Sequence, residues 1–323
     1  MDKKLVKSFL EAIAVGDACG KATEYCSKDE IESVYSKIET ILTPERSLSH
    51  KDLFWGQVTD DTEQNFQLIK MYAEKGRVNA LDTAYCLVDW LSDPKVEKYI
   101  GPSSRSALLS IREGADIDKA GVAGITCGGI MRVPAAFLFS TSETLECNVY
   151  ECLKPTHNTS IAMESAMAYA YALKEAAKKN CTPVSIMISA KNGAEIGKHY
   201  GSRERLTGVG PSINRRIDFI MKENVGNMTE RDLKILIYDV LGATMASYDV
   251  ASAVFALFLY AKNDVSLVIR LATEIGGDSD TIACLSAALC TLYAKGHNID
   301  KEEINLVSKA NSIDFDELAS LIP

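Results

Sequence analysis

Asp249–Lys262 has the sequence DVASAVFALFLYAK, and this stretch decides the fold class. It is apolar almost all round, which is typical of a helix that is buried on every side. A second stretch, Ser160–Lys179, is rich in Ala, Met, Glu, Lys and Leu, which are strong helix formers. The two stretches predict long helices, and we expect the first of them to be central.

Three further apolar stripes have a helical period, and each precedes a glycine of the kind that ends helices. No run of alternating apolar and polar residues stands out, so strands should be few or absent. Without a repeat or a low-complexity linker, the sequence predicts one all-α domain, a helical bundle over residues 1–323. The stripes are Leu5, Phe9 and Ile13 before Gly16; Phe66, Ile69 and Tyr72 before Gly76; and Ile282, Leu285, Leu289 and Leu292 before Gly296.

The composition is that of an acidic globular protein. Hydrophobic residues make up 47% of the 323 residues and charged residues 24%, which is enough for a packed core. The formal net charge of −9 argues against nucleic-acid binding through a basic face. The longest purely apolar run, Ala253–Ala261, is far shorter than the roughly 20 residues of a membrane-spanning helix.

The nine cysteines do not indicate disulfides. Their number is odd and no C-x-x-C occurs, while the four histidines are too scattered for a zinc site. The first twenty residues lack the long apolar core of a signal peptide. We therefore expect a cytoplasmic monomer whose cysteines are free and mostly buried.

Four segments between the expected helices hold the polar residues that could carry chemistry, and we expect them to be non-helical junctions. The second and fourth each place two carboxylates and a threonine within four residues, where an apolar stripe begins. The segments are Gly16–Gly20 with Glu24 after it, Trp55–Glu63, Thr126–Arg132 and Gly276–Thr281.

Helix capping is one interpretation of the two acidic segments. Thr and Asp accept hydrogen bonds from the free N–H groups of a first turn, and Asp60 and Glu63 have the spacing of a capping box. One cap needs only one side-chain oxygen, however, and surplus carboxylates repel one another unless a cation lies between them. Oxygen ligands favour Mg²⁺, Mn²⁺ or Ca²⁺. Metal binding and capping both stay open for either segment alone.

The same segments give the chain a resemblance to the ADP-ribosylglycohydrolases. Gly-Asp-Ala-x-Gly, Thr-Asp-Asp-Thr, Gly-x-x-Met-Arg and Gly-Gly-Asp-x-Asp-Thr occur in that family in the same order, and here they span nearly the whole chain. The resemblance implies an all-α orthogonal bundle with a site for two metal ions, usually Mg²⁺, which Mn²⁺ can replace. It implies hydrolysis of a glycosidic bond to ribose, with release of ADP-ribose from a protein or a small molecule.

Carried over by position, the resemblance implies a role for each motif residue. Three alternatives stay open: Glu24 as a solvated loop residue, His157 as a cap of the following helix, and Gly101–Arg105 as a plain turn. The implied metal ligands are Thr59, Asp60, Asp61, Asp278, Asp280 and Thr281; the catalytic carboxylates are Glu24 and Asp61, with Asp17 as support; and the ADP-ribose contacts are Gly128, Gly129, His157, Gly101 and Ser103.

Two positions depart from the family pattern and bear on the substrate. Cys127 stands where family members often have asparagine, next to the glycines that approach the diphosphate. Tyr99 stands where arginine-directed members often have an aspartate that pairs with a guanidinium. These departures keep two alternatives open: a glycosidase for a smaller ribosyl or nucleoside-like compound, and a non-catalytic ADP-ribose-binding protein.

Overall fold

The computed structural model describes residues 1–201 and 209–323, and its secondary structure is helical. Apart from an isolated bridge between Thr126 and Ala246, no β-structure occurs in these two ranges. The predicted all-α fold is therefore confirmed. The α-helices are α1 (Lys3–Gly20), α2 (Lys28–Val34), α3 (Asp60–Lys75), α4 (Ala80–Trp90), α5 (Pro102–Arg112), α6 (Ile117–Ala120), α7 (Val133–Leu138), α8 (Leu145–Leu153), α9 (Ser160–Ala176), α10 (Pro183–Gly197), α11 (Ile213–Lys222), α12 (Glu230–Ile235), α13 (Ser247–Ala261), α14 (Val265–Ile275), α15 (Ser279–Ala294), α16 (Lys301–Asn311) and α17 (Phe315–Leu321).

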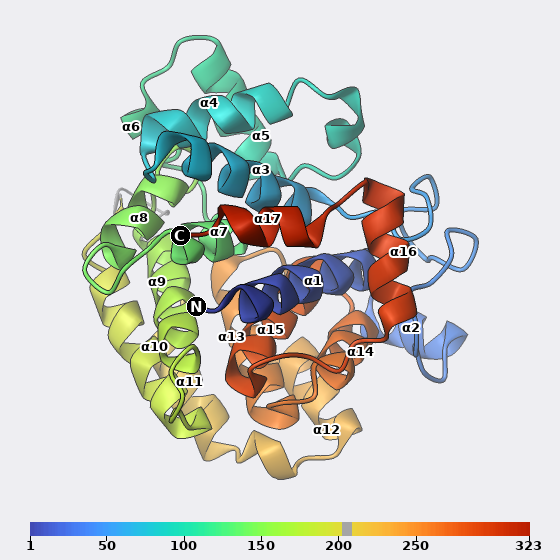
Figure 1. Ribbon diagram of the computed structural model, residues 1–323. Helices are drawn as coiled ribbons and strands as arrows, with labels where there is room; N and C mark the ends of the chain where they lie inside the picture. Colours follow the sequence, from blue (N-terminus) through green and yellow to red (C-terminus); the bar gives the residue numbers. More distant parts are fainter. Residues whose placement is uncertain (202–208) are drawn as a thin grey trace.

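Short 3-10 or π-helical segments connect several of these helices: η1 (Lys21–Thr23), η2 (Pro94–Lys98), η3 (Ile130–Arg132), η5 (Val225–Asn227) and η6 (Leu236–Leu241). In Figure 1, α1 crosses the middle of the bundle in front of α15, and α17 lies beside it. Helices α9 and α10 pack along each other at one side, and α3 to α6 form the top of the view. The first and last helices of the chain are thus neighbours.

The helices with the fewest polar residues form the centre, as their sequences predict. In α13 and α15 nearly every position is buried, and α9 is buried over most of its length. These helices share one large apolar cluster with α1 and α14. The predicted central helix at Asp249–Lys262 is observed as α13.

One predicted helix end is wrong. Helix α1 continues through Gly16 to Gly20, so the segment expected to be a non-helical junction is its last turn. A Cβ atom at Gly16 would lie 2.8 Å from the carbonyl oxygen of Ala283, and one at Gly20 would lie 2.4 Å from Cα of Asp280. Both glycines therefore allow α1 to pack closely on α15, and they place Asp17 on a rigid helix.

The other two stripes end close to the predicted positions. Gly76, with φ +65°, caps the end of α3 in the left-handed conformation. At the end of α15 the left-handed residue is Lys295, one position before the expected Gly296. Of the nine cysteines, all of which are unpaired, five are buried.

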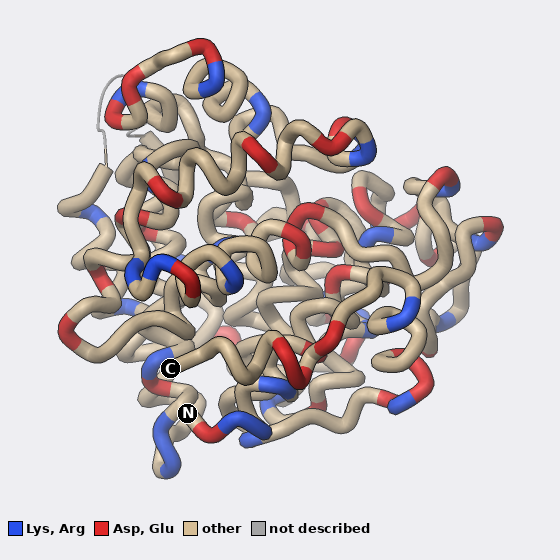
Figure 2. Tube along the Cα trace, turned by 45° about the horizontal axis from the view of Figure 1, so that its top comes forward, with Lys and Arg blue, Asp and Glu red and all other residues tan. Residues whose placement is uncertain are grey.

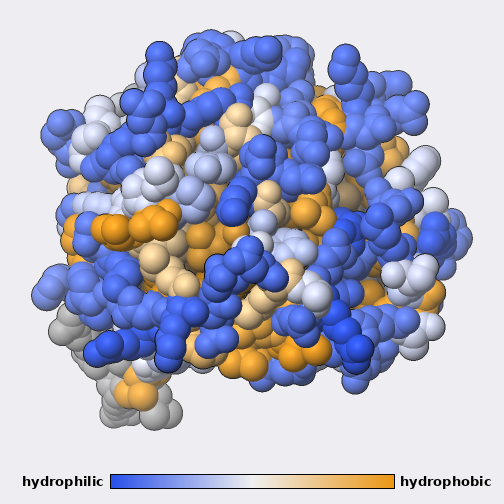
Figure 3. Space-filling view, turned by 90° about the horizontal axis from the view of Figure 1, so that it is seen from below, coloured by the Kyte–Doolittle hydropathy of each residue, from blue (hydrophilic) through white to orange (hydrophobic). Residues whose placement is uncertain are grey.

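The surface agrees with the acidic, globular composition. In the view of Figure 2, basic segments are interspersed with acidic ones instead of gathering on one face. Figure 3 shows hydrophilic side chains over most of another face, with apolar patches between them. Among the described residues, no helix combines the length and apolar character that crossing a membrane requires.

Replacing Gly20 by alanine should destabilise the protein. The added methyl group would collide with the backbone of Ser279 and Asp280, so α1 and α15 would have to move apart, at a cost of about 1–3 kcal/mol in the free energy of unfolding. Urea denaturation followed by circular dichroism measures this loss. The control is Gly101→Ala, whose methyl group has open space; the N-cap preference that it loses and the backbone entropy that it gains nearly offset, so it should change the free energy of unfolding by less than about 1 kcal/mol. Equal stabilities of the two variants would contradict the close-packing argument.

Candidate active site

Both acidic helix starts lack the side-chain cap that the capping interpretation requires. Thr59 precedes α3 and Asp278 precedes α15, and neither side chain accepts a hydrogen bond from the turn that follows it. Glu63, expected to close a capping box, instead accepts hydrogen bonds from Trp90 Nε1 at 2.9 Å and from the Tyr99 hydroxyl at 3.0 Å. Capping is therefore the wrong explanation of these two segments.

Asp17 supplies the missing cap from another helix. Its carboxylate accepts hydrogen bonds from the backbone N–H of Thr59 at 3.0 Å, from the Thr59 hydroxyl at 2.8 Å and from the backbone N–H of Thr62 at 3.0 Å. These bonds satisfy free N–H groups at the first turn of α3, which is the task of an N-cap. Asp17 thereby fixes the start of α3 against α1, in agreement with its expected supporting role.

The acidic segments, far apart in the chain, meet in space. Carboxylate oxygens of Asp17, Asp61 and Asp280 lie within 4.8 Å of one another, and so do those of Glu24, Asp278 and Asp280. All five side chains are buried, and so is that of Asp60. Glu24 is therefore no ordinary solvated loop residue, and that alternative is wrong.

The hydrogen bonds around the cluster leave two carboxylate oxygens without a partner. The Thr281 hydroxyl lies 3.1 Å from Asp61 Oδ2 and 3.3 Å from Asp278 Oδ1. The remaining oxygens, Asp61 Oδ1 and Asp278 Oδ2, are buried and accept no hydrogen bond from any described residue. Buried polar atoms without partners are costly, so these two oxygens fit a site that could hold a cation.

Electrostatics leads to the same conclusion. Burial first, and then the charge of Glu24, raises the pKa of Asp60 and Asp280 well above the usual aspartate range. The pKa of Asp61 is also raised well above that range, mainly by burial and next by the charge of Asp17. The pKa of Asp278 is raised to about 7, again by burial and then by Glu24. Such carboxylates ionise together only next to positive charge, and an all-oxygen donor set fits Mg²⁺.

A narrow cleft of about 20 Å³ opens onto this cluster. It contains several predicted residues, namely Glu24, Asp60, Gly101 and Gly128. It also contains side chains that the sequence did not single out, among them Tyr25, which is exposed, and Met245. The complete lining is Glu24, Tyr25, Asp60, Tyr99, Gly101, Thr126, Cys127, Gly128, Met131, Met245, Asp278, Asp280 and Thr281.

Met245 reaches the cleft through backbone pairing that no local pattern reveals. The carbonyl oxygen of Met245 accepts a hydrogen bond from the backbone N–H of Cys127 at 2.7 Å, beside the bridge between Thr126 and Ala246. In the same loop, the carbonyl oxygen of Ala243 accepts a hydrogen bond from the backbone N–H of Asp278 at 2.8 Å. The segment that follows η6 thus joins the mid-chain motif to the last one.

His157 does not line the cleft, but it contacts two residues that do, Thr126 and Gly128. Its Nε2 lies 2.9 Å from the Thr126 hydroxyl, and a Cβ atom at Gly128 would lie 2.8 Å from its ring. Burial first, and then the charge of Arg132, lowers the pKa of His157 well below the usual histidine value, so the ring stays neutral. The cap of α9 is Thr159, so the alternative of His157 as that cap is wrong.

Two other predicted substrate contacts also lie outside the cleft lining. Gly129 faces the side chain of His157, where an added Cβ atom would come within 2.9 Å of the histidine Cβ. Ser103 lies in the first turn of α5, after Gly101. Only Gly101 and Gly128 of the five predicted ADP-ribose contacts therefore line the cleft.

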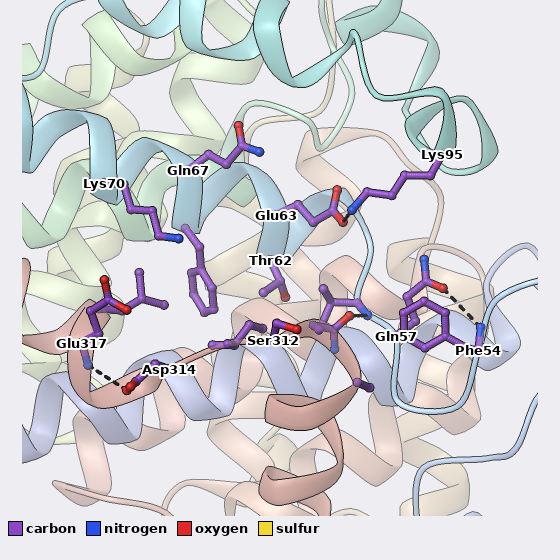
Figure 4. A pocket seen from close by; sticks show the side chains of 16 residues that line it. Phe54, Gln57, Thr62, Glu63, Gln67, Lys70, Lys95, Ser312, Asp314 and Glu317 are labelled. Atoms are coloured by element: carbon purple, nitrogen blue, oxygen red, sulfur yellow. Dashed lines mark hydrogen bonds and ion pairs between the residues drawn. The ribbon is translucent and has the colours of Figure 1, made fainter.

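A larger pocket of about 350 Å³ lies on another side of α3 (Figure 4). Lys70 and Glu63 reach over it from α3, and Asp314 and Glu317 lie at its α17 side. None of the predicted metal ligands lines it. Glu63 links this pocket to the cleft. It forms an ion pair with Lys95 of the pocket at 2.9 Å and accepts a hydrogen bond from the hydroxyl of Tyr99, which lines the cleft. The carboxylate cluster, and not this pocket, is therefore the candidate active site.

Comparisons with known proteins agree with this geometry. The family model for ADP-ribosylglycohydrolase matches residues 3–322. The uncharacterized protein YegU of Escherichia coli (strain K12) is 24% identical over 332 aligned positions, which cover 100% of this chain and 97% of YegU. An uncharacterized protein of Archaeoglobus fulgidus is 28% identical over 291 positions, which cover 90% of this chain and 87% of that protein. The solved structure of an ADP-ribosylglycohydrolase-related protein complex has the same fold, with a TM-score of 0.72 at 20% identity and coverage of 99% and 97%.

Without divalent metal, the protein should lose stability as the pH rises from about 4 to about 7. The pKa of Asp278 is raised in the folded state, so the folded protein binds more protons than the unfolded chain, and this stabilisation disappears as Asp278 ionises. The expected loss is on the order of a few kcal/mol. Denaturation in EDTA across this pH range measures it.

Mg²⁺ should reduce that dependence, and at a hundred times its dissociation constant it should add about 2.7 kcal/mol. Asp278→Asn is the matched control, because it removes a repelling charge: its stability in EDTA should vary less with pH, and Mg²⁺ should stabilise it less. A parent protein whose stability in EDTA rises with pH through this range would contradict the electrostatic argument.

Proposed function

This chain belongs to the ADP-ribosylglycohydrolase family, and from that premise we propose that it is a Mg²⁺-dependent hydrolase of the glycosidic bond between ribose and a leaving group in an ADP-ribosylated molecule. The observation that carries the proposal is the buried carboxylate cluster with its two unpartnered oxygens, Asp61 Oδ1 and Asp278 Oδ2. A non-catalytic binder has no need for Glu24 beside that cluster.

The ions would be held by the two acidic segments. When bound, Mg²⁺ supplies positive charge that orients ribose hydroxyls and favours deprotonation of water. Asp61 was predicted as both ligand and catalytic carboxylate, and we assign it to the ions alone, because it does not line the cleft. Asp17 orients the ligands from behind through Thr59. The proposed ligands are Thr59, Asp60, Asp61, Asp278, Asp280 and Thr281.

Glu24 is the proposed acid–base residue. Its loop is fixed to the start of α15 by two backbone hydrogen bonds, from Tyr25 N–H to the oxygen of Gly277 at 2.7 Å and from Gly277 N–H to the oxygen of Cys26 at 2.9 Å. The carboxyl group lines the cleft at the edge of the cluster. From there it can give a proton to the departing group and take one from the attacking water, which is the task of a general acid–base.

The residues around Glu24 favour a leaving group other than arginine. The Tyr99 hydroxyl donates its hydrogen bond to Glu63, and a tyrosine cannot form the ion pair with a guanidinium that an aspartate forms. Cys127, which stands in the cleft where family members often have asparagine, supports the second candidate function, hydrolysis of a smaller ribosyl compound.

Thermal unfolding with Mg²⁺ and a ligand should separate the two candidates. ADP-ribose should raise the melting temperature clearly more than ribose 5-phosphate at equal concentration, because additional contacts stabilise the folded state. An equal or larger effect of ribose 5-phosphate would favour the smaller substrate. If neither ligand raises it, both candidates lose their support.

Glu24→Gln should keep Mg²⁺ binding and lose turnover. The substitution is nearly isosteric and leaves the six proposed ligand side chains in place, but it removes proton transfer, which is typically worth ~10²–10⁴ in rate. Asp280→Asn should lose Mg²⁺ affinity and rate together. Single-turnover hydrolysis of ADP-ribosylated peptides and the Mg²⁺-induced shift in melting temperature measure the two effects. Retention of more than about a tenth of the parental rate by Glu24→Gln would remove Glu24 from this role.

A further inference from the structure

We propose that His50 is a positioning residue that holds Glu24 in the orientation needed for catalysis. The inference rests on the proposed function, because it assigns a role to the neighbour of the proposed acid–base residue. His50 does not line the cleft, so it would act through Glu24 and not on the substrate.

His50 Nε2 donates a hydrogen bond to Oε2 of Glu24. Both side chains are almost buried, with 10% of the histidine and 5% of the glutamate exposed. The ring of Tyr25 lies beside this pair, with its centroid 6.3 Å from that of His50. A hydrogen bond shielded from water in this way restrains a side chain more than one at the surface does.

The backbone around His50 is tied to the segment that leads to Glu24. The carbonyl oxygen of Ala22 accepts hydrogen bonds from the Leu48 N–H and from the Ser47 hydroxyl, each at 3.0 Å. The Ser49 hydroxyl donates to the carbonyl oxygen of Lys21 at 2.8 Å. The loop before His50 thus follows η1 closely, and the position of the imidazole is set by the same backbone that carries Glu24.

Electrostatics explains why Glu24 needs such a partner. Its carboxylate lies beside those of Asp278 and Asp280, so repulsion tends to push it away from the cluster when no cation is bound. The donor of His50 occupies Oε2 and leaves Oε1 free for proton transfer. Misplacing a catalytic group by about 1 Å can cost up to ~10²-fold in rate, so loss of the fixed orientation of Glu24 should lower the rate measurably.

The chain offers a matched control for a merely structural role. His297 Nε2 donates to Glu11 Oε2 at 2.9 Å, and the exposed fractions of these two side chains are 10% and 11%. This second pair has the same chemistry and burial as His50 and Glu24 but lies outside the cleft. His297→Ala should therefore lose a similar amount of stability as His50→Ala and keep the parental kcat and KM.

The experiment compares His50→Ala, His50→Gln, Glu24→Gln and the double variant with the parent, on an ADP-ribosylated peptide with Mg²⁺. His50→Ala should lower kcat about 10–100-fold and leave KM within about threefold, as expected when a supporting side chain is lost. His50→Gln, which keeps a donor at nearly the same place, should recover most of kcat. In the Glu24→Gln background, His50→Ala should cost nothing further, because residues that act as a unit are not additive.

Three kinetic outcomes would overturn the inference: a kcat of His50→Ala within about twofold of the parent, an equal further loss in the Glu24→Gln background, or an equal loss of kcat in His297→Ala. Crystal structures of His50→Ala and His50→Gln give a readout that needs no activity. Glu24 should turn away from the cluster in the first and return in the second, and an unmoved Glu24 in His50→Ala also refutes the inference. If the parent cleaves no ADP-ribosyl substrate, the proposed function fails, and the position of Glu24 still decides the role of His50.

Discussion

The contact on which the site depends is the capping of one helix by a carboxylate of another. Asp17 lies in the last turns of α1 and satisfies the first turn of α3, while Gly16 and Gly20 bring the same stretch of α1 against the start of α15. One rigid helix therefore holds two acidic helix starts at a fixed separation. The price is a group of buried carboxylates whose like charges repel one another and oppose folding.

The local sequence was sufficient to predict the helices, because apolar periodicity and helix propensity depend on residues close together in the chain. The apolar period located α1, α3 and α15, composition located α9 and α13, and the motif order led to the family. It failed at Gly16, because a glycine that ends a helix and a glycine that admits a neighbouring helix look the same in the sequence. Only the backbone of Ala283, which is distant in the chain, distinguishes them. The capping interpretation of Thr59 failed for the same reason. Its hydroxyl donates a hydrogen bond to Asp17, on another helix, and accepts none from the first turn of α3.

Family membership fixes the class of chemistry more firmly than the substrate. The relatives and the solved structure share 20–28% identity with this chain, and the two positions that depart from the family pattern, Tyr99 and Cys127, both line the cleft. Neither Met245 nor His50 belongs to a motif. Met245 reaches the cleft by backbone pairing, and His50 reaches Glu24 from a loop that runs along η1. Residues of this kind become visible only when distant segments are placed side by side.

The pairing of α1 with α15 and α17 also has a consequence for synthesis on the ribosome. Helix α1 is buried almost completely from Leu5 onward, yet two of the helices that cover it, α15 and α17, begin only at Ser279 and Phe315. Until then its apolar face stays uncovered, and Asp17 has no complete site to organise. Contacts between distant parts of a chain form slowly and leave such surfaces open to aggregation. The carboxylate cluster therefore assembles only after α15 has been made, and until then a molecular chaperone has an apolar surface to protect.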